Sequence, residues 1–157
     1  MADVAVIAGS SSDKDIMKKT LDMLEKLHIS YEFTICSAHR SPQRTIQYAK
    51  TAKERGIKVI IAGAGGAAHL AGTIAAHSTL PVIAVPLANS PFNGLDALLS
   101  CVQMPSGVPV ATVSVGEAGA KNAAILAAQI LSLNDRELNT TLDQFKKEME
   151  KQGRIID

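Results

Sequence analysis

Three short stretches of the chain are apolar at every position: residues 4–8, 59–62 and 82–85. Such an uninterrupted apolar run is typical of a strand that is buried on both faces of a sheet. Residues 31–35 and 110–115 complete a set of five predicted strands. A segment with helical character follows each of them, so the chain repeats a strand-then-helix unit.

This repeated unit predicts the α/β fold class. Strands joined by helices run parallel, and right-handed crossovers place helices on both faces of the sheet, which makes three layers. We therefore expect a single doubly wound five-stranded parallel sheet of the flavodoxin-like order 2-1-3-4-5. The first predicted helix includes residues 16–27. The second starts at Ser41-Pro42, with a serine cap, and stops at Gly56. The others cover residues 67–77, residues 95–102, and Gly119 to about Leu133. Pro86 is expected to end the fourth strand.

A further helix, over about residues 135–151, follows the completed sheet. Its apolar residues recur at helical spacing and form one stripe: Leu138, Leu142, Phe145 and Met149. The stripe must be buried either against the helix's own domain or against a neighbouring subunit, and both alternatives stay open. We expect one domain over residues 1–157, with its core at about 3–133.

Composition and charge exclude several classes of partner. The net charge of +1 gives no strong electrostatic field, and no basic face or stripe for nucleic acid stands out in the sequence. No apolar run approaches the roughly 20 residues that a membrane helix needs, and the start of the chain lacks the pattern of a signal peptide. Cys36 and Cys101 form no C-x-x-C pair and are expected to be free thiols. We expect a cytoplasmic protein without a membrane partner.

Polar and glycine residues follow the predicted strands, at the edge where open α/β sheets bind ligands. They form four groups: residues 9–13 (Gly-Ser-Ser-Ser-Asp), residues 37–40 (Ser-Ala-His-Arg), residues 63–66 (Gly-Ala-Gly-Gly) with His69, and residues 86–90 (Pro-Leu-Ala-Asn-Ser). Because these ends of parallel strands share one edge, we expect a small-molecule site there.

Two of these groups indicate a nucleotide-like ligand. Serines at a helix start combine hydroxyls with unpaired N–H groups, where the helix dipole favours an anion. Arg40 would bind phosphate through its forked guanidinium, and Asp13 would accept hydrogen bonds from sugar hydroxyls. The alternatives are that residues 10–13 only cap the helix and that Arg40 is an ordinary surface residue.

The glycine loop fits G-x-G-x-x-A weakly. The acidic residue that would bind a dinucleotide's ribose is missing, because residues 83–88 are uncharged, so a dinucleotide oxidoreductase is disfavoured. No G-x-x-x-x-G-K-[ST] run is present, and no aspartate ends the third strand as in a receiver module. The loop predicts instead a close backbone approach to a small planar ligand, with a small dry space beside it.

His39 is the best catalytic candidate, because an imidazole can move a proton in either direction near neutral pH. His69, at the start of the helix after the glycine loop, is the second. The alternatives are a loop histidine that only forms hydrogen bonds and a capping or spacer residue. No histidine pair has the spacing of a metal motif, so no metal site is expected.

Four motifs occur in order along the chain: residues 9–13, 37–42 (Ser-Ala-His-Arg-Ser-Pro), 63–70 (Gly-Ala-Gly-Gly-Ala-Ala-His-Leu) and 103–110 (Gln-Met-Pro-Ser-Gly-Val-Pro-Val). Together they make the chain resemble the class I N5-carboxyaminoimidazole ribonucleotide mutases, the phosphoribosylaminoimidazole carboxylase catalytic subunit family. The resemblance implies a cofactor-free isomerase that converts N5-carboxyaminoimidazole ribonucleotide to 4-carboxy-5-aminoimidazole ribonucleotide in de novo purine (IMP) biosynthesis.

The resemblance also implies roles for individual residues. Ser10 and Arg40 would bind phosphate, Asp13 would bind ribose with Ser12 nearby, and His39 would handle the proton. His69 is kept as a second catalytic residue. The other expected substrate-binding residues are Ser37, Ala38, Gly65, Gly66, Ala67 and Leu70, with released CO2 held over residues 65–67. Family members form homo-octamers with sites at subunit junctions, which would bury the last helix.

Two alternatives to the mutase reaction stay open. Class II relatives carboxylate aminoimidazole ribonucleotide directly with CO2, and only the resemblance of residues 63–70 and of Arg40 favours class I. Ser11 stands where many relatives have a lysine or another polar residue. The other alternative is a nucleotide-binding module without chemistry, which would tolerate changes at His39.

Overall fold

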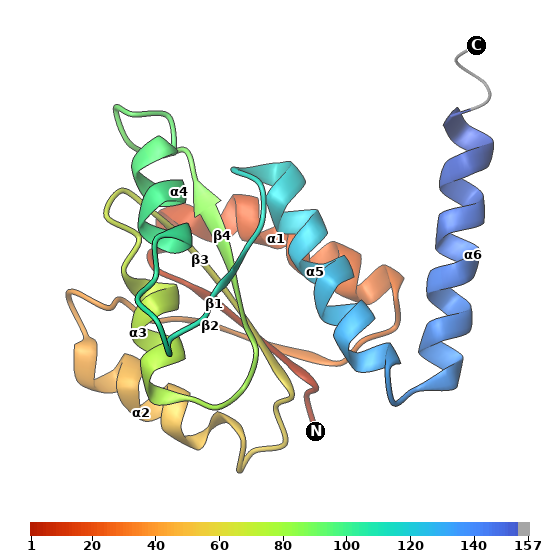
Figure 1. Ribbon diagram of the computed structural model, residues 1–157, viewed down its shortest axis with the longest axis horizontal. Helices are drawn as coiled ribbons and strands as arrows, with labels where there is room; N and C mark the ends of the chain where they lie inside the picture. The colour runs from red at the N-terminus through yellow and green to blue at the C-terminus, as the bar shows by residue number, and fades with distance from the viewer. Residues whose placement is uncertain (154–157) are drawn as a thin grey trace.

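The computed structural model describes residues 1–153; the last residues of the predicted domain, 154–157, lie outside the described part. Its centre is a five-stranded parallel sheet of order β2-β1-β3-β4-β5, which confirms the predicted topology (Figure 1). The strands are β1 (Val4–Ala8), β2 (Tyr31–Ile35), β3 (Val59–Gly65), β4 (Val82–Leu87) and β5 (Ala111–Thr112).

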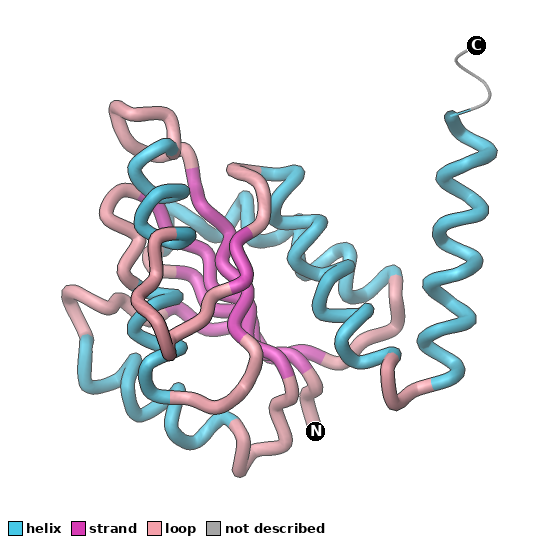
Figure 2. The backbone as a smooth tube through the Cα atoms, in the orientation of Figure 1, coloured by secondary structure: helices cyan, strands magenta, loops and turns pink. Residues whose placement is uncertain are grey.

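Helices cover both faces of the sheet and complete the three predicted layers (Figure 2). The helical elements are η1 (Ser11–Asp13), α1 (Lys14–Lys26), α2 (Pro42–Ala52), α3 (Leu70–His77), α4 (Leu95–Val102), α5 (Glu117–Ser132) and α6 (Arg136–Gly153). Val4 and Val6 of β1 face α1 and α5, whereas Ala5 and Ile7 face the layer of α2, α3 and α4. Because β1 is buried on both faces, its sequence is apolar throughout.

Small side chains let the helices pack closely in a chain with only 3% aromatic residues. α5 buries a row of alanines that includes Ala120 and Ala124. Thr20 of α1 is fully buried there, and its hydroxyl donates a hydrogen bond to the carbonyl oxygen of Ala120 at 2.8 Å. This bond satisfies the buried hydroxyl of Thr20 where α1 packs against α5.

Two central strands are longer than predicted. β3 continues to Gly65 and β4 to Leu87, so the prediction that Pro86 ends a strand was wrong. The carbonyl oxygens of Ala84 and Pro86 accept hydrogen bonds from Val113 and Gly116 beyond them, at 3.1 and 2.9 Å. In a strand, the N–H and the C=O of one residue point to the same side. The N–H that proline lacks would therefore have faced β5, and no hydrogen bond to β3 is lost.

The edge strand and the third helix are shorter than predicted. β5 pairs with β4 only through Ala111 and Thr112, because the chain then leaves the sheet with single bonds from Val113 and Gly116. α3 begins at Leu70 rather than near residue 67, because Ala68 has a left-handed φ of 43° that no helix accommodates.

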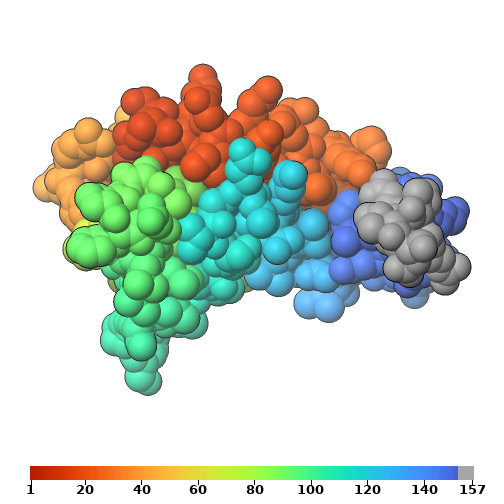
Figure 3. Space-filling view, turned by 90° about the horizontal axis from the view of Figure 1, so that it is seen from above, coloured from red at the N-terminus to blue at the C-terminus, as the bar shows by residue number. Residues whose placement is uncertain are grey.

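α6 begins at a cap, where Asp135 Oδ1 accepts hydrogen bonds from the N–H groups of Glu137 and Leu138, both at 3.0 Å. Leu142 is only 7% exposed and belongs to the core cluster that also contains residues of α1 and α5. Farther along, Met149 is 49% exposed. α6 lies at the end of the molecule farthest from α2 (Figures 1 and 3). The first half of the apolar stripe thus packs on its own domain.

Candidate functional site

A cavity of about 300 Å³ opens at the carboxyl ends of β1, β2, β3 and β4. The end of β3 and the segments that follow the strands supply its lining, which consists of Gly9, Ser10, Asp13, Ser37, Ala38, His39, Arg40, Ala64, Gly65, Ala68, His69, Leu70 and Asn89. Most of the residues expected from the sequence to form a site are thus brought together. The edge at which they meet is the one that the parallel topology favours for ligands.

Three expected site residues do not line this cavity: Ser12, Gly66 and Ala67. Ser12 is exposed, and its hydroxyl lies 3.0 Å from Ser10 Oγ and 3.5 Å from Asp13 Oδ1. Gly66 and Ala67 form a tight turn, closed by a hydrogen bond from the Ala68 N–H to the Gly65 carbonyl at 3.1 Å. The turn points Ala67 outward, where it is exposed.

Two serines hold the loop that carries His39 and Arg40. Ser41 Oγ accepts a hydrogen bond from the Ser37 N–H and donates one to the Ser37 carbonyl, both at 3.2 Å. Ser37 Oγ accepts from the Arg40 N–H at 3.1 Å. The prediction that the Ser41 side chain caps α2 was wrong, because its hydroxyl turns back to Ser37. These bonds make the loop a defined support for the imidazole and the guanidinium.

The two candidate histidines form a pair. His39 Nε2 lies 2.6 Å from His69 Nδ1, and the rings meet edge to face with an interplanar angle of 84°. His69 occupies the N-cap position of α3, but its side chain makes no capping bond. Since one nitrogen of this contact must donate and the other accept, the two rings hold a single proton between them. The pair can accept or release a proton beside the cavity.

Asp13 is the buried charge of the site. It is only 3% exposed, and its Oδ1 accepts a hydrogen bond from Asn89 Nδ2 at 2.8 Å. Burial raises the pKa of this carboxyl above its ordinary value, although hydrogen bonds from Ser10, Asn89 and Ser12 and the charge of Arg40 act in the opposite direction. A desolvated carboxylate with arranged donors at a cavity is typical of a ligand site. Ser10 also caps η1, so capping and cavity lining coexist there.

Comparison with known proteins adds to this geometry. A protein-family model described as AIR carboxylase matches residues 3–152. The chain belongs to this family. A Bacillus subtilis (strain 168) relative, named N5-carboxyaminoimidazole ribonucleotide mutase, is 58% identical over 144 residues, which are 92% of this chain and 89% of the relative. The resemblance inferred from the four motifs is confirmed.

Relatives in the family extend to distant organisms. A Pyrococcus abyssi (strain GE5 / Orsay) protein of the same name is 52% identical over 151 residues, covering 96% of this chain and 86% of the relative. The crystal structure of Treponema denticola PurE is 32% identical and has a TM-score of 0.85, with 98% of this chain and 94% of that chain covered. The three-layer fold is therefore that of a solved member.

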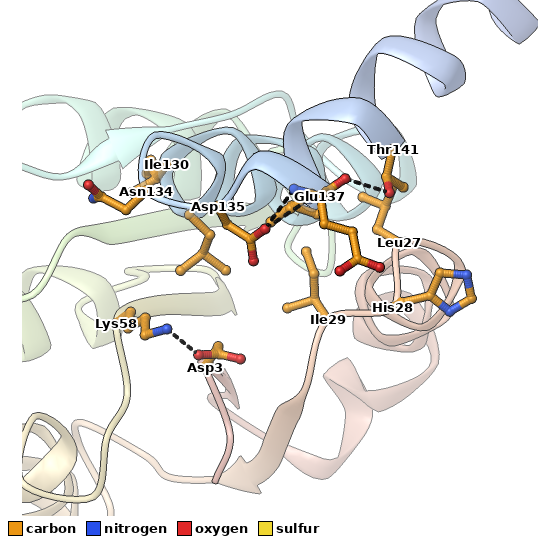
Figure 4. Close-up of a pocket in the computed structure, with 12 residues that line it drawn as sticks. Asp3, Leu27, His28, Ile29, Lys58, Ile130, Asn134, Asp135, Glu137 and Thr141 are labelled. Atoms are coloured by element: carbon orange, nitrogen blue, oxygen red, sulfur yellow. Dashed lines mark hydrogen bonds and ion pairs between the residues drawn. The ribbon is translucent and has the colours of Figure 1, made fainter.

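A larger cavity, of about 580 Å³, lies at the opposite edge of the sheet (Figure 4). Asp3 and Lys58, which precede β1 and β3, form an ion pair of 2.7 Å there, and Asp135 caps α6. The carboxylates of Asp3 and Asp135 are thus engaged in local structure. Because this cavity adjoins the amino ends of the strands, the smaller cavity remains the candidate site of this AIR carboxylase family member.

Sequence reasoning assigned no role to Asn89, Gly9, Ala64 or Ala68, which also line the cavity. Its position after the fourth strand placed Asn89 in the expected group of residues 86–90 at this edge, but no contact of its side chain could be predicted. Cys36 and Cys101 are buried and free. Within residues 1–153, no cluster of three or more His, Cys, Asp or Glu side chains is placed to hold a metal ion. No helix in this part of the chain has the length and apolar character needed to cross a membrane.

Proposed function

We propose that this chain is an N5-carboxyaminoimidazole ribonucleotide mutase of purine (IMP) biosynthesis, an isomerase that makes 4-carboxy-5-aminoimidazole ribonucleotide. The observation that carries the proposal is the pair of His39 and His69, whose Nε2 and Nδ1 atoms lie 2.6 Å apart. The pair lines a cavity that is also lined by Ser10, Asp13 and Arg40. The relatives from Bacillus subtilis and Pyrococcus abyssi, both named as mutases, support the choice of reaction.

The substrate binds through its charged and polar ends. Ser10 and Arg40 bind the phosphate, at the start of the η1–α1 segment where N–H groups and the helix dipole favour an anion. Asp13 accepts hydrogen bonds from ribose hydroxyls, with the Ser12 hydroxyl beside it, 3.5 Å from Asp13 Oδ1. The imidazole ring of the substrate then lies toward Gly65 and Leu70, and the Ser37-Ala38 backbone borders it. The support for this placement is that all but Ser12 line one cavity.

His39 carries out both proton transfers. As an imidazolium it protonates N5 of the substrate while the N–C bond to the carboxylate breaks and CO2 leaves. C4 of the aminoimidazole ring then attacks CO2 and forms the new C–C bond. Neutral His39 removes the proton from C4, which restores the aromatic ring and regenerates the imidazolium. His69, in contact with His39, completes the pair that holds this proton.

Small residues retain the CO2 between the two steps. Gly65, Ala64 and Ala68 line the cavity, so this part of the CO2 site shifts from the expected residues 65–67 to residues 64, 65 and 68. Walls without polar side chains weaken the solvation of the departing carboxylate. Holding CO2 beside C4 makes its recapture effectively intramolecular.

The proposal is tested by incubating the purified protein with N5-carboxyaminoimidazole ribonucleotide in the absence of ATP and added bicarbonate. Formation of the C4-carboxylated product above the uncatalysed rate is the expected result. The family's description as AIR carboxylase favours a second candidate, direct carboxylation of aminoimidazole ribonucleotide. Product formed only from that nucleotide with high CO2 would establish the second candidate, and no product from either would indicate a binding module.

We further propose that the protein acts in the cytoplasm as a homo-octamer, with each site near a subunit junction. Exposed apolar side chains on and just before α4 support assembly: Phe92, Leu95, Leu99 and Val102 are 69%, 56%, 49% and 53% exposed, and the three that lie on the helix recur at helical spacing. A contiguous exposed apolar surface of this kind marks interaction sites. The subunit number rests on the resemblance to the mutases.

A further inference from the structure

We infer that Asn89 is a positioning residue of this site, which holds the Asp13 carboxylate so that one of its oxygens stays available to the ligand. The inference rests on the proposed function, in which Asp13 accepts hydrogen bonds from the ribose. It concerns a residue outside the four motifs that carry the family resemblance.

The first step of the argument is the origin of the donors to Asp13. The other hydrogen bonds to its carboxylate come from Ser10 and Ser12, which belong to the same short loop. Among the described side chains, Asn89 is the only one from another element that donates to it, across 76 positions of sequence. The bond therefore ties the loop after β1 to the loop after β4.

The second step is the chemistry of the contact. A carboxylate can only accept hydrogen bonds, so the amide must direct its NH2 group toward Asp13. Both Asn89 Nδ2, at 2.8 Å, and Ser12 Oγ, at 3.5 Å, reach Oδ1. Oδ2 lies on the side of Gly9, 3.5 Å from the position that a Cβ would take there, and Gly9 lines the cavity. Asn89 and Ser12 thus both engage Oδ1, and neither side chain contacts Oδ2 on the Gly9 side of the cavity.

The third step is the packing of the amide. A Cβ built on Gly65 would lie 1.5 Å from Asn89 Oδ1 and 2.3 Å from Asn89 Cγ. The Asn89 side chain therefore occupies the space that a larger residue at position 65 would fill. This contact accounts for a glycine at the end of β3 without reference to the ligand.

The test is a binding measurement with aminoimidazole ribonucleotide, by isothermal titration calorimetry, together with kcat and KM. Asn89→Leu removes the donor at nearly constant size. Because a hydrogen bond to a charged group is involved, we expect the dissociation constant and KM to rise roughly 10- to 100-fold, with a smaller change in kcat. Asn122→Leu, on the exposed face of α5, makes the same replacement away from the site and should leave affinity unchanged.

A double-mutant cycle separates positioning from general disturbance. In an Asp13→Asn background, Asn89→Leu should weaken binding by less than about threefold, because no carboxylate remains to be oriented. An equal loss of affinity in both backgrounds, or unchanged affinity of Asn89→Leu alone, overturns the inference.

Gly65→Ala serves as a second variant if Asn89→Leu does not fold. This substitution keeps the Asn89 amide but displaces it, so the loss of nucleotide affinity should again be smaller in the Asp13→Asn background. Wild-type protein that neither binds nor converts its nucleotide overturns the proposed function itself, and the inference with it.

Discussion

At the scale of single residues, the contact between His39 and His69 makes two loops act together. The loops follow β2 and β3, and they bring His39 Nε2 to 2.6 Å from His69 Nδ1. The serine bonds around Ser37 and Ser41 keep the first loop in place. In the proposed reaction, this geometry fixes the orientation of the His39 ring, which must come within hydrogen-bonding reach of the substrate atom that gains or loses the proton.

We predict that His39→Asn lowers turnover at least about 100-fold, the minimum for loss of a true general acid–base. Binding of aminoimidazole ribonucleotide should remain, since the phosphate and ribose groups are untouched. The assay is steady-state kinetics beside calorimetric binding. His77→Asn is the matched control, because its Nδ1 only contacts the Thr73 carbonyl, at 2.9 Å. Near-normal turnover of His39→Asn would remove His39 from the mechanism.

Arg40→Ala should weaken nucleotide binding about tenfold or more, because a charged hydrogen bond to phosphate is lost. The loss should shrink for the dephosphorylated nucleoside, which has no group for Arg40 to bind. Arg44→Ala is the control, since the Arg44 guanidinium contacts Thr34 at 3.3 Å instead of lining the cavity. An affinity for the nucleotide that does not change on Arg40→Ala would exclude Arg40 from the phosphate site.

Asp13→Asn tests the buried charge. Burial raises the pKa of Asp13 in the folded state, so its ionised form is a cost to folding that appears as the pH rises through the ordinary carboxyl range, from about pH 4 upward. A neutral amide avoids this cost. We predict that Asp13→Asn gains thermal stability relative to wild type between pH 4 and pH 7, while nucleotide affinity falls. A stability difference that is constant or declines over this range would contradict the assignment.

At the scale of elements, the apolar runs were sufficient to predict the sheet, its order and the edge at which the site forms. They were not sufficient to predict where β3 and β4 end. Backbone pairing continues through Gly63 to Gly65 and through Pro86, and hydropathy carries no information about such pairing. The bond between Asn89 and Asp13 was also beyond prediction, because it depends on side-chain conformations in two loops that only the folded chain brings together.

The approach of α5 to the end of the sheet gives a prediction at this scale. A Cβ on Gly119 would lie 1.6 Å from the carbonyl oxygen of Ser114, which is backbone and cannot turn aside. Gly119→Ala should therefore lower the free energy of unfolding by about 1–3 kcal/mol, as overpacking typically does. Chemical denaturation measures the effect, with Ala118→Ser on the exposed neighbouring position as the control. Unchanged stability would show that α5 can shift freely.

At the scale of the whole molecule, two groups of apolar side chains are exposed in the single chain. One is the row from Phe92 to Val102 along α4, and the other includes Met149 near the end of α6. The sequence predicted an apolar stripe on α6 but could not decide which chain would cover it. The structure buries Leu142 within its own domain, so the first alternative holds for that part of the helix. It leaves Met149 half exposed, and burial of that end against a neighbouring subunit stays a prediction.

Leu99→Lys tests the proposed assembly. A charge in the middle of the α4 row should be buried without a partner in the octamer, so the variant should dissociate into smaller species. Light scattering after size-exclusion chromatography measures the mass, and circular dichroism checks that each subunit stays folded. An octamer of undiminished stability in the variant would show that α4 lies outside the interfaces.

The central claim is that the carboxyl group leaves N5 as CO2, stays in the cavity and returns to C4 of the same nucleotide. The most direct measurement uses substrate with a ¹³C-labelled carboxylate, turned over in unlabelled CO2 and bicarbonate with carbonic anhydrase to keep them equilibrated. The account predicts product that retains the ¹³C label, as read by mass spectrometry. Product that carries the unlabelled carbon of the medium would contradict it, because CO2 would then be taken from solution.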